Sequence, residues 1–138
     1  MSDFLDVIAK AASFSAHKAS AEAGQVTLGE LVARLEGADQ SKPVKFDNGK
    51  SPGHFNSYRG YYDMVAISRG KKCSVGQFLK LAKEAIGGTF TGYKGSEFTM
   101  TKMTPVWVSE YGMSSGIGVT DIDTSGDMVI LKTAVIDP

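Results

Sequence analysis

The chain has few of the residues that make disulfides, metal sites and catalytic pairs. Its 138 residues include one cysteine, Cys73, and two histidines, His17 and His54. A single cysteine excludes an intrachain disulfide and a cysteine-rich zinc site. Neither histidine has neighbours within three to five positions that would complete a set of metal ligands. We therefore expect no metal ion and no cofactor.

The chain also lacks net charge and long apolar runs. Fifteen basic residues balance fifteen acidic residues, so the total charge gives no broad attraction for nucleic acid, although a local basic patch is compatible with this balance. No apolar run approaches the ~20 residues that span a bilayer, and the N-terminus lacks the basic start and continuous apolar core of a signal peptide. These absences predict a cytoplasmic protein, exclude a membrane partner and argue against nucleic acid as a partner.

The thiol of Cys73 has two interpretations. Lys71 and Lys72 precede it, just before a predicted helix, and their charges would lower the pKa of the thiol and make it reactive. The other interpretation is an inert free thiol in a reducing compartment. We favour the second, because a catalytic thiolate also needs a histidine partner.

What is present is the composition of an ordinary globular domain. Apolar residues make up 42% and charged residues 22% of the chain, and its 16 glycines and 4 prolines are not excessive. A chain of this length fits one domain. We divide it into an N-terminal helix, residues 1–24, and a single α+β domain, residues 25–138. The second half of the helix is rich in alanine and serine and has few large anchors, so we expect an appendage or a contact between subunits of a homo-oligomer.

Two further segments have the sequence of a capped helix. Thr27 with Glu30, and Ser74 with Gln77, have the spacing of a capping box, in which each side chain satisfies a backbone N–H that the helix leaves unpaired. The strings Thr-Leu-Gly-Glu and Ser-Val-Gly-Gln place a glycine at the same position. Either an internal duplication or a shared capping solution explains this similarity, and from the sequence we favour the shared capping solution. An apolar stripe follows each box: Leu28, Leu31, Val32 and Leu35 in the first helix, and Val75, Phe78, Leu79, Leu81, Ala82 and Ile86 in the second.

Alternating and β-branched residues predict the strands. Residues 48–53 and 111–118 are glycine-rich and predict loops, and Asp-Thr-Ser-Gly-Asp at 123–127 predicts a hairpin turn. Trp107 alternates with two valines and should lie in the core. Together these elements predict an α+β fold: a mainly antiparallel sheet of five or six strands with the two capped helices on one face and an extra N-terminal helix. The predicted strands are residues 42–47, 63–67, 104–109, 117–122 and 128–136, and residues 89–100 are also β-prone.

Residues 54–62, His-Phe-Asn-Ser-Tyr-Arg-Gly-Tyr-Tyr, carry the strongest functional signal. Four aromatic residues surround Arg59, whose planar guanidinium can bind phosphate or carboxylate oxygens in a fork, while the aromatic rings offer faces for a base or sugar. A purely structural alternative remains, in which Arg59 pairs with Asp63 or Glu97 and the tyrosines pack along a strand.

Residues 91–97, Thr-Gly-Tyr-Lys-Gly-Ser-Glu, have a similar character. Both segments lead into predicted strands, so we expect them to converge on one rim of the sheet and form an anion-binding pocket with aromatic walls. The alternative is a turn with a solvated lysine. The candidate ligand-binding residues are His54, Ser57, Tyr58, Arg59, Tyr61, Tyr62, Tyr93, Lys94 and Glu97.

Other candidate sites are weaker. Ser114–Gly118 could cradle phosphate through backbone N–H groups, but it opens no helix and no Lys-Ser/Thr follows it, so neither nucleotide fingerprint is met. Asp121, Asp123 and Asp127 lie near a turn, but their spacing fails the twelve-residue calcium loop. No catalytic set of nucleophile, acid and base stands out.

The segments Asn-Ser-Tyr-Arg-Gly-Tyr-Tyr and Gly-Thr-Phe-Thr-Gly-Tyr-Lys-Gly, followed by Thr-Pro-Val-Trp-Val, make the chain resemble a family of small uncharacterised proteins encoded by bacteriophages. The resemblance covers about residues 26–133 and carries no activity with it. A phage origin implies that the protein acts in the cytoplasm of the host cell, and it favours a role in countering host defence. By analogy, compact proteins that sequester nucleotide immune signals need an Arg/Lys pair, aromatic residues and no catalytic set.

Four functional hypotheses follow. The first is a non-catalytic phage protein that binds an anionic, nucleotide-like small molecule and sequesters a host immune signal. The second is a protein–protein inhibitor that uses the tyrosine and arginine surface against a host protein, since these residues dominate interface energies. The third is a nucleotide-acting enzyme with His54, Glu97 or a tyrosine as acid or base. The fourth is a minor structural or accessory phage protein, a role that leaves no trace in the sequence.

Overall fold

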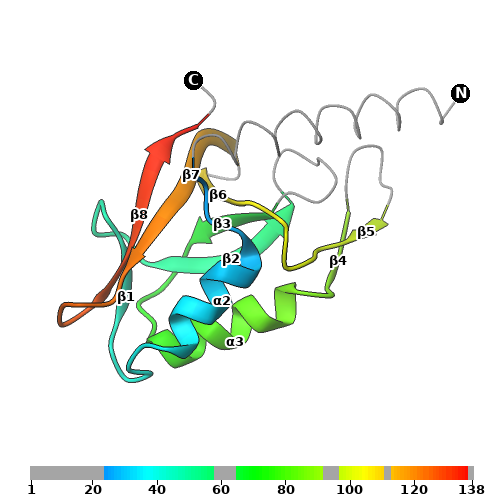
Figure 1. Cartoon of the computed structure of the whole chain (residues 1–138). Helices are drawn as coiled ribbons and strands as arrows, with labels where there is room; N and C mark the ends of the chain where they lie inside the picture. The colour runs from blue at the N-terminus through cyan, green and yellow to red at the C-terminus, as the bar shows by residue number, and fades with distance from the viewer. Residues whose placement is uncertain (1–23, 58–64, 92–96, 111–112, 137–138) are drawn as a thin grey trace, which may run out of the picture.

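The computed structural model of the chain describes residues 24–57, 65–91, 97–110 and 113–136. The N-terminal helix predicted for residues 1–24 lies outside this part, apart from Gly24. Two helices and eight strands are present (Figure 1). In chain order they are α2 (Leu28–Glu36), β1 (Val44–Phe46), β2 (Pro52–Ser57), β3 (Val65–Arg69), α3 (Val75–Ala85), β4 (Thr89–Thr91), β5 (Glu97–Thr99), β6 (Val106–Glu110), β7 (Met113–Asp123) and β8 (Val129–Val135).

Six of the strands form one mixed sheet in the order β1-β8-β7-β6-β3-β2. The pairs β1–β8 and β3–β6 are parallel, and the other three pairs are antiparallel. The outer strands β1 and β2 also contact each other, so the sheet nearly closes into a barrel. Strands β4 and β5 form a separate two-stranded sheet. The α+β class is therefore confirmed, and the sheet is mixed and curled, which the sequence patterns did not predict.

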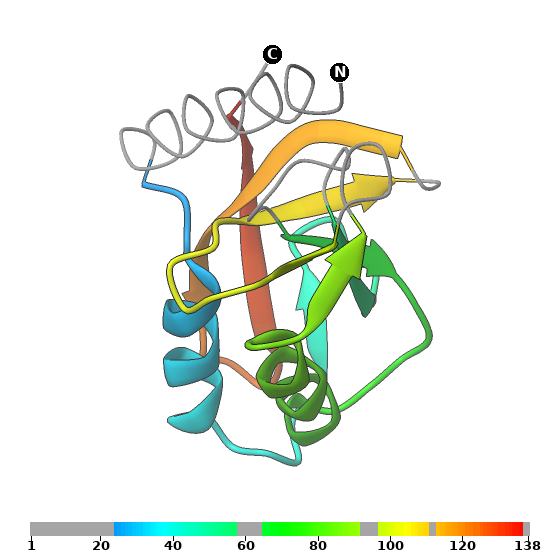
Figure 2. The same cartoon turned by 90° about the vertical axis from the view of Figure 1, so that its right-hand side faces the viewer.

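Both predicted capping boxes are confirmed. At the start of α2, the Thr27 hydroxyl accepts a hydrogen bond from the backbone N–H of Glu30, and the Glu30 carboxylate accepts one from the N–H of Thr27. Ser74 and Gln77 do the same at the start of α3. The apolar stripes of the two helices are largely buried, and the helices contact each other below the barrel (Figures 1 and 2).

The first turn of α2 is also held by a loop from far along the chain. The N–H of Leu28 donates to the carbonyl oxygen of Thr104 at 2.7 Å, and the N–H of Gly29 donates to that of Lys102 at 2.9 Å. Four N–H groups at a helix start lack partners within the helix. The capping box and this loop together satisfy them, and they fix α2 to the segment that leads into β6.

The first turn of α3 is held in the same way. The N–H of Val75 donates to the carbonyl oxygen of Lys42 at 2.8 Å, and the N–H of Gly76 donates to that of Gln40 at 3.0 Å. Here the loop leads into β1. In each case the residue at the helix N-cap forms an antiparallel bridge with the proline that precedes the strand. We call this arrangement the helix-start clamp.

The strands that follow the clamps also correspond. Val44 of β1 lies opposite Val129 of β8, and Val106 of β6 lies opposite Val65 of β3, both in parallel register. The antiparallel pairs next to them, β2–β3 and β7–β8, also correspond. The register of the first pair shifts between Pro52 and Phe55, and that of the second shifts at the equivalent position, between Val119 and Asp121. The chain therefore repeats a unit of one helix and three strands: α2-β1-β2-β3 and α3-β6-β7-β8, with β4–β5 inserted in the second. The match extends far beyond a shared helix cap and favours an internal duplication.

The core lies between the inner face of the barrel and the two helices. Val44, Ile67 and Leu131 from the strands are fully buried with Phe78 from α3. Trp107 is buried as predicted, with only 2% of its surface exposed, but it is not part of this main cluster.

Two predicted loops are partly strand in the structure. Residues 48–51 lie outside the strands, as predicted, but Pro52 and Gly53 begin β2. Strand β7 begins at Met113, so the predicted loop at 111–118 is largely strand. Gly118 explains part of this difference: a Cβ there would lie 2.7 Å from the side chain of Gln25, so the glycine serves close packing rather than a turn.

The helix-start clamp yields a matched pair of glycine substitutions. A Cβ at Gly29 would lie 2.9 Å from both the Cβ and the carbonyl oxygen of Lys102, whereas at Gly76 the nearest atom, the carbonyl oxygen of Gln40, is 3.4 Å away. We expect Gly29→Ala to lower the free energy of unfolding by about 1–3 kcal/mol through overpacking. Gly76→Ala should leave it unchanged or raise it by up to ~1 kcal/mol, because alanine is the better helix former. Urea denaturation followed by circular dichroism measures both; equal effects at the two glycines would contradict the clamp geometry.

Candidate functional site

Three of the predicted ligand-binding residues lie in the described part of the chain. His54 is exposed on β2, and Ser57 is the last residue of the same strand. Glu97 is exposed and begins β5, where it pairs with Thr91. These residues therefore stand on the strands that flank the two predicted binding segments. The other six lie outside the described residues: Tyr58, Arg59, Tyr61, Tyr62, Tyr93 and Lys94.

The strands that lead into the two segments lie together. Strand β4 contacts β2, and α3 also contacts β2. Between them is a groove of about 300 Å³, which we call the β2–α3 groove. The residues that line it are His54, Phe55, Leu81, Glu84, Ala85, Gly88 and Thr89.

Phe55 and Ser68 set the position of His54 in this groove. The ring of Phe55 stacks on that of Phe78 with centroids 5.3 Å apart, which fixes β2 against α3. The backbone N–H of His54 lies 3.3 Å from the Ser68 hydroxyl oxygen, and that hydroxyl lies 3.3 Å from the carbonyl oxygen of His54. Phe55 is partly buried against the core, while His54 is exposed and lines the groove.

The second repeat contains an equivalent groove between α2 and β7. Phe55 lies opposite Ile67 in the first repeat, and Ile122 lies opposite Leu131 in the second. Phe55 and Ile122 therefore hold equivalent positions, and so do the residues that precede them, His54 and Asp121. The second groove has a volume of about 220 Å³ and is lined by Gly24, Val26, Glu30, Ala33, Arg34, Thr120, Asp121 and Ile122.

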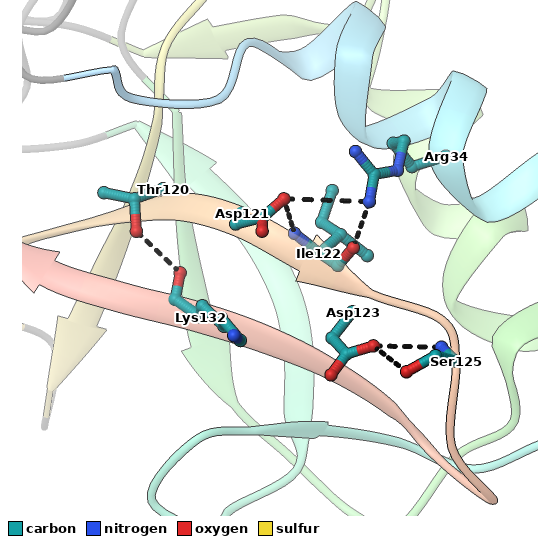
Figure 3. Close-up of polar contacts among 7 residues, drawn as sticks. All are labelled: Arg34, Thr120, Asp121, Ile122, Asp123, Ser125 and Lys132. Carbon is teal, nitrogen blue, oxygen red and sulfur yellow. Dashed lines mark hydrogen bonds and ion pairs between the residues drawn. The ribbon is translucent and has the colours of Figure 1, made fainter.

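Arg34 and Asp121 bind the irregular backbone of β7 in this second groove (Figure 3). The Arg34 guanidinium donates to the carbonyl oxygen of Ile122, and the Asp121 carboxylate accepts the Ile122 N–H at 2.8 Å. The two side chains are 3.7 Å apart and about half exposed, so their ion pair adds little stability. The pair chiefly satisfies backbone groups where the β7–β8 register shifts. Sequence reasoning missed this role, because neither residue signals a bulge.

The acidic residues of the β7–β8 turn bind their own loop. Asp123 accepts hydrogen bonds from the hydroxyl and the backbone N–H of Ser125, at 2.6 and 2.9 Å. These bonds lower the pKa of Asp123 below its usual value. Within the described ranges, no group of three or more histidine, cysteine, aspartate or glutamate residues could hold a metal ion.

The thiol of Cys73 is not activated. It is half-buried, and burial raises its pKa, while the charge of Lys45 acts in the opposite direction. The interpretation in which Lys71 and Lys72 lower the pKa of the thiol is therefore wrong, because the effect of burial on the pKa outweighs that of nearby charge. The inert interpretation of this thiol agrees with the structure.

The backbone role of Asp121 predicts a difference between two substitutions. Asp121→Ala leaves the N–H of Ile122 without its acceptor, and we expect the free energy of unfolding to fall by about 1 kcal/mol. Asp121→Asn keeps an acceptor oxygen and loses only a half-exposed ion pair, so it should cost less, about 0–0.5 kcal/mol. Thermal and urea unfolding of the two variants test this. If Asn and Ala destabilise equally, the charge rather than the hydrogen bond is what matters.

Comparisons with known proteins add no family to this picture. No protein-family model matches the chain, and neither does any curated protein or solved structure. None of the helices in the described ranges is long and apolar enough to cross a membrane. The evidence on function is therefore limited to the residues themselves and to the positions that the fold gives them.

Proposed function

We propose that this protein binds an anionic, nucleotide-like small molecule without chemically changing it, and that it serves a bacteriophage by sequestering a host immune signal. The site would lie where residues 58–64 and 92–96 leave the described strands. The observation that carries the proposal is that these two segments follow strands that contact each other, β2 and β4.

Their starting points are close because β2 contacts β4. The first segment follows Ser57 of β2, and the second follows Thr91 of β4. Beyond the first segment, the N–H of Val65 donates to the carbonyl oxygen of Pro105 at 3.3 Å. The second segment is bounded by Thr91 and Glu97, which pair with each other in the β4–β5 sheet. We propose that the two segments converge near the contact between β2 and β4.

The other end of the barrel offers a parallel for residues 58–64 only. There the corresponding bond joins the N–H of Val129 to the carbonyl oxygen of Pro43 at 2.9 Å. The connection between β7 and β8 also contacts the connection that precedes β1, since the Lys42 ammonium donates to the carbonyl oxygen of Gly126 at 2.8 Å. Residues 92–96 belong to the β4–β5 insertion, which the first repeat lacks, so their convergence with residues 58–64 is part of the proposal.

The chemistry of the segments then sets the ligand. Arg59 and Lys94 would bind phosphate oxygens, Arg59 in a fork and Lys94 as a point charge. Tyr61 and Tyr93 would stack on a base or sugar. His54 and Glu97, both exposed on the flanking strands, would contact the polar edge of the ligand. The described residues bring no nucleophile together with an acid and a base, which favours binding over catalysis.

Arg59→Ala tests the binding site. Charge-assisted hydrogen bonds contribute about 1.5–3 kcal/mol each, so we expect the Kd for the preferred nucleotide to rise by about 10- to 100-fold. The measurement is isothermal titration calorimetry against a panel of nucleoside phosphates and cyclic dinucleotides, after native mass spectrometry of protein purified from bacteria has reported any copurified small molecule. Lys80→Ala, an exposed cation in the middle of α3, is the matched control and should bind like the wild type.

Two results would overturn the proposal. One is unchanged nucleotide binding by Arg59→Ala. The other is release of a cleaved product, rather than the intact molecule, when the loaded protein is denatured after incubation. Stable capture of a host protein that is lost in Arg59→Ala, with no nucleotide bound, would assign the same residues to protein inhibition instead.

A further inference from the structure

The outer face of the barrel is buried at its centre. In β6, Val106 and Val108 belong to the main core, so the side chain of Trp107 between them lies on the opposite, outer side of the sheet. A sheet face that is not packed on the core normally contacts water, yet only 2% of the surface of Trp107 is exposed. An element outside the main core therefore covers this indole.

The buried area extends across three strands in one row. Ala66 of β3 lies beside Trp107 in parallel register, and Gly118 of β7 lies opposite it in antiparallel register. Both are buried, and neither belongs to the main cluster. The next positions of the row, Asn56 on β2 and Ala134 on β8, are exposed. The burial is thus confined to the middle of the face, and we call Ala66, Trp107 and Gly118 the outer patch.

The neighbours of Trp107 in this row are too small to bury it. Alanine contributes one methyl group and glycine has no side chain, whereas a tryptophan that is buried removes about 150–250 Å² from water. One large side chain between two small ones leaves room for an element that lies across the strands. The cover of the outer patch therefore comes from another part of the chain.

The side chain of Gln25 lies at the edge of the outer patch. A Cβ at Gly118 would lie 2.7 Å from the amide nitrogen of Gln25 and 2.8 Å from Cγ1 of Ile136, so both side chains lie against this glycine. The same amide nitrogen donates to the carbonyl oxygen of Val106 at 2.7 Å. Gln25 is buried, and it places the start of the described chain beside Trp107.

The backbone next to Gln25 is held on both sides. The N–H of Val26 donates to the carbonyl oxygen of Val119 at 2.7 Å, and the N–H of Val106 donates to the carbonyl oxygen of Val26 at 3.0 Å. The chain therefore enters the fold between β7 and β6. Residues 1–23 connect to the fold at this point, next to the outer patch.

The sequence of residues 1–23 suits a cover for this patch. A helix of about 20 residues is roughly 30 Å long, which is enough to cross three strands spaced about 4.8 Å apart. On its apolar stripe the large side chains come first and only small ones follow towards Gln25, where they can pack closely on a protruding indole. The stripe consists of Phe4, Ile8, Ala11, Ala12 and Ala19.

We propose that residues 1–23 form a helix that lies across the outer patch of the same molecule, with its alanine-rich half packed on Trp107. The partner of this surface is then a segment of the chain itself. Residues 58–64 are a less suitable cover, because they join two strands that pair directly at Ser57 and Val65 and so have no need to cross the sheet. The inference does not depend on the proposed ligand site.

The fluorescence of Trp107 tests this proposal in the full chain, because it is the only tryptophan. In the wild type we expect emission at short wavelength and little quenching by acrylamide. Ala19→Asp places a charge on the covered side of the helix and should detach it, so that the emission moves to longer wavelength and the quenching constant rises several-fold. A cooperative urea transition, followed by circular dichroism, establishes that the barrel of this variant is folded.

Ala21→Asp is the matched control. It is the same substitution two positions further along, and in a helix of 3.6 residues per turn these two positions lie on opposite sides. Its emission and quenching should match those of the wild type. Ile8→Ala weakens the covered side without adding a charge, and it should change both values in the same direction as Ala19→Asp, by less; it therefore tests the proposal even if the aspartate variant does not fold.

Three results would overturn the proposal. One is a tryptophan that acrylamide quenches freely in the wild type. Another is an equal response, or no response, in Ala19→Asp and Ala21→Asp, which would assign the cover to another segment such as residues 58–64. The third is protection that falls as the protein is diluted, which would assign the helix to a second copy of the chain. Arg59→Ala should keep the wild-type fluorescence, so the cover and the ligand site are tested independently.

Discussion

The whole architecture depends on how the first turn of each helix is held. A helix start is a costly element, because its N–H groups need partners outside the helix. Here those partners are carbonyl groups of loops that lie far away in the sequence: Thr104 and Lys102 for α2, and Lys42 and Gln40 for α3. Each loop continues through a proline directly into a strand. The clamp therefore does two things at once, since it completes the helix and fixes where β6 or β1 enters the barrel.

Sequence patterns could find one half of this clamp but not the other. The capping boxes are local, three residues apart, and both were predicted correctly from Thr27 and Ser74. The loops that complete them lie 33 to 76 residues away in the sequence: Val75 and Lys42 are 33 positions apart, and Leu28 and Thr104 are 76 apart. No local signal specifies these distances. The same limit applies to the parallel pairs β1–β8 and β3–β6, which make the sheet mixed. A strand pattern reveals alternation, not the identity of the neighbour.

The same limit applies to the candidate site. The side-chain chemistry of residues 54–62 is visible in the sequence, because aromatic residues and an arginine in one short stretch are a local feature. Their setting is not: that β2 contacts β4, and that Phe55 stacks on Phe78, follow from packing over long distances.

The two repeats differ in the polar residues of their grooves and in what these residues bind. In the second repeat, Arg34 and Asp121 occupy the groove and bind the backbone of β7, so that position is committed to stability. In the first repeat the corresponding strand carries His54, which is exposed, and no arginine reaches it from α3, where the equivalent residue is Leu81. We therefore propose that the β2–α3 groove, where His54 is exposed, is the groove that takes part in ligand binding.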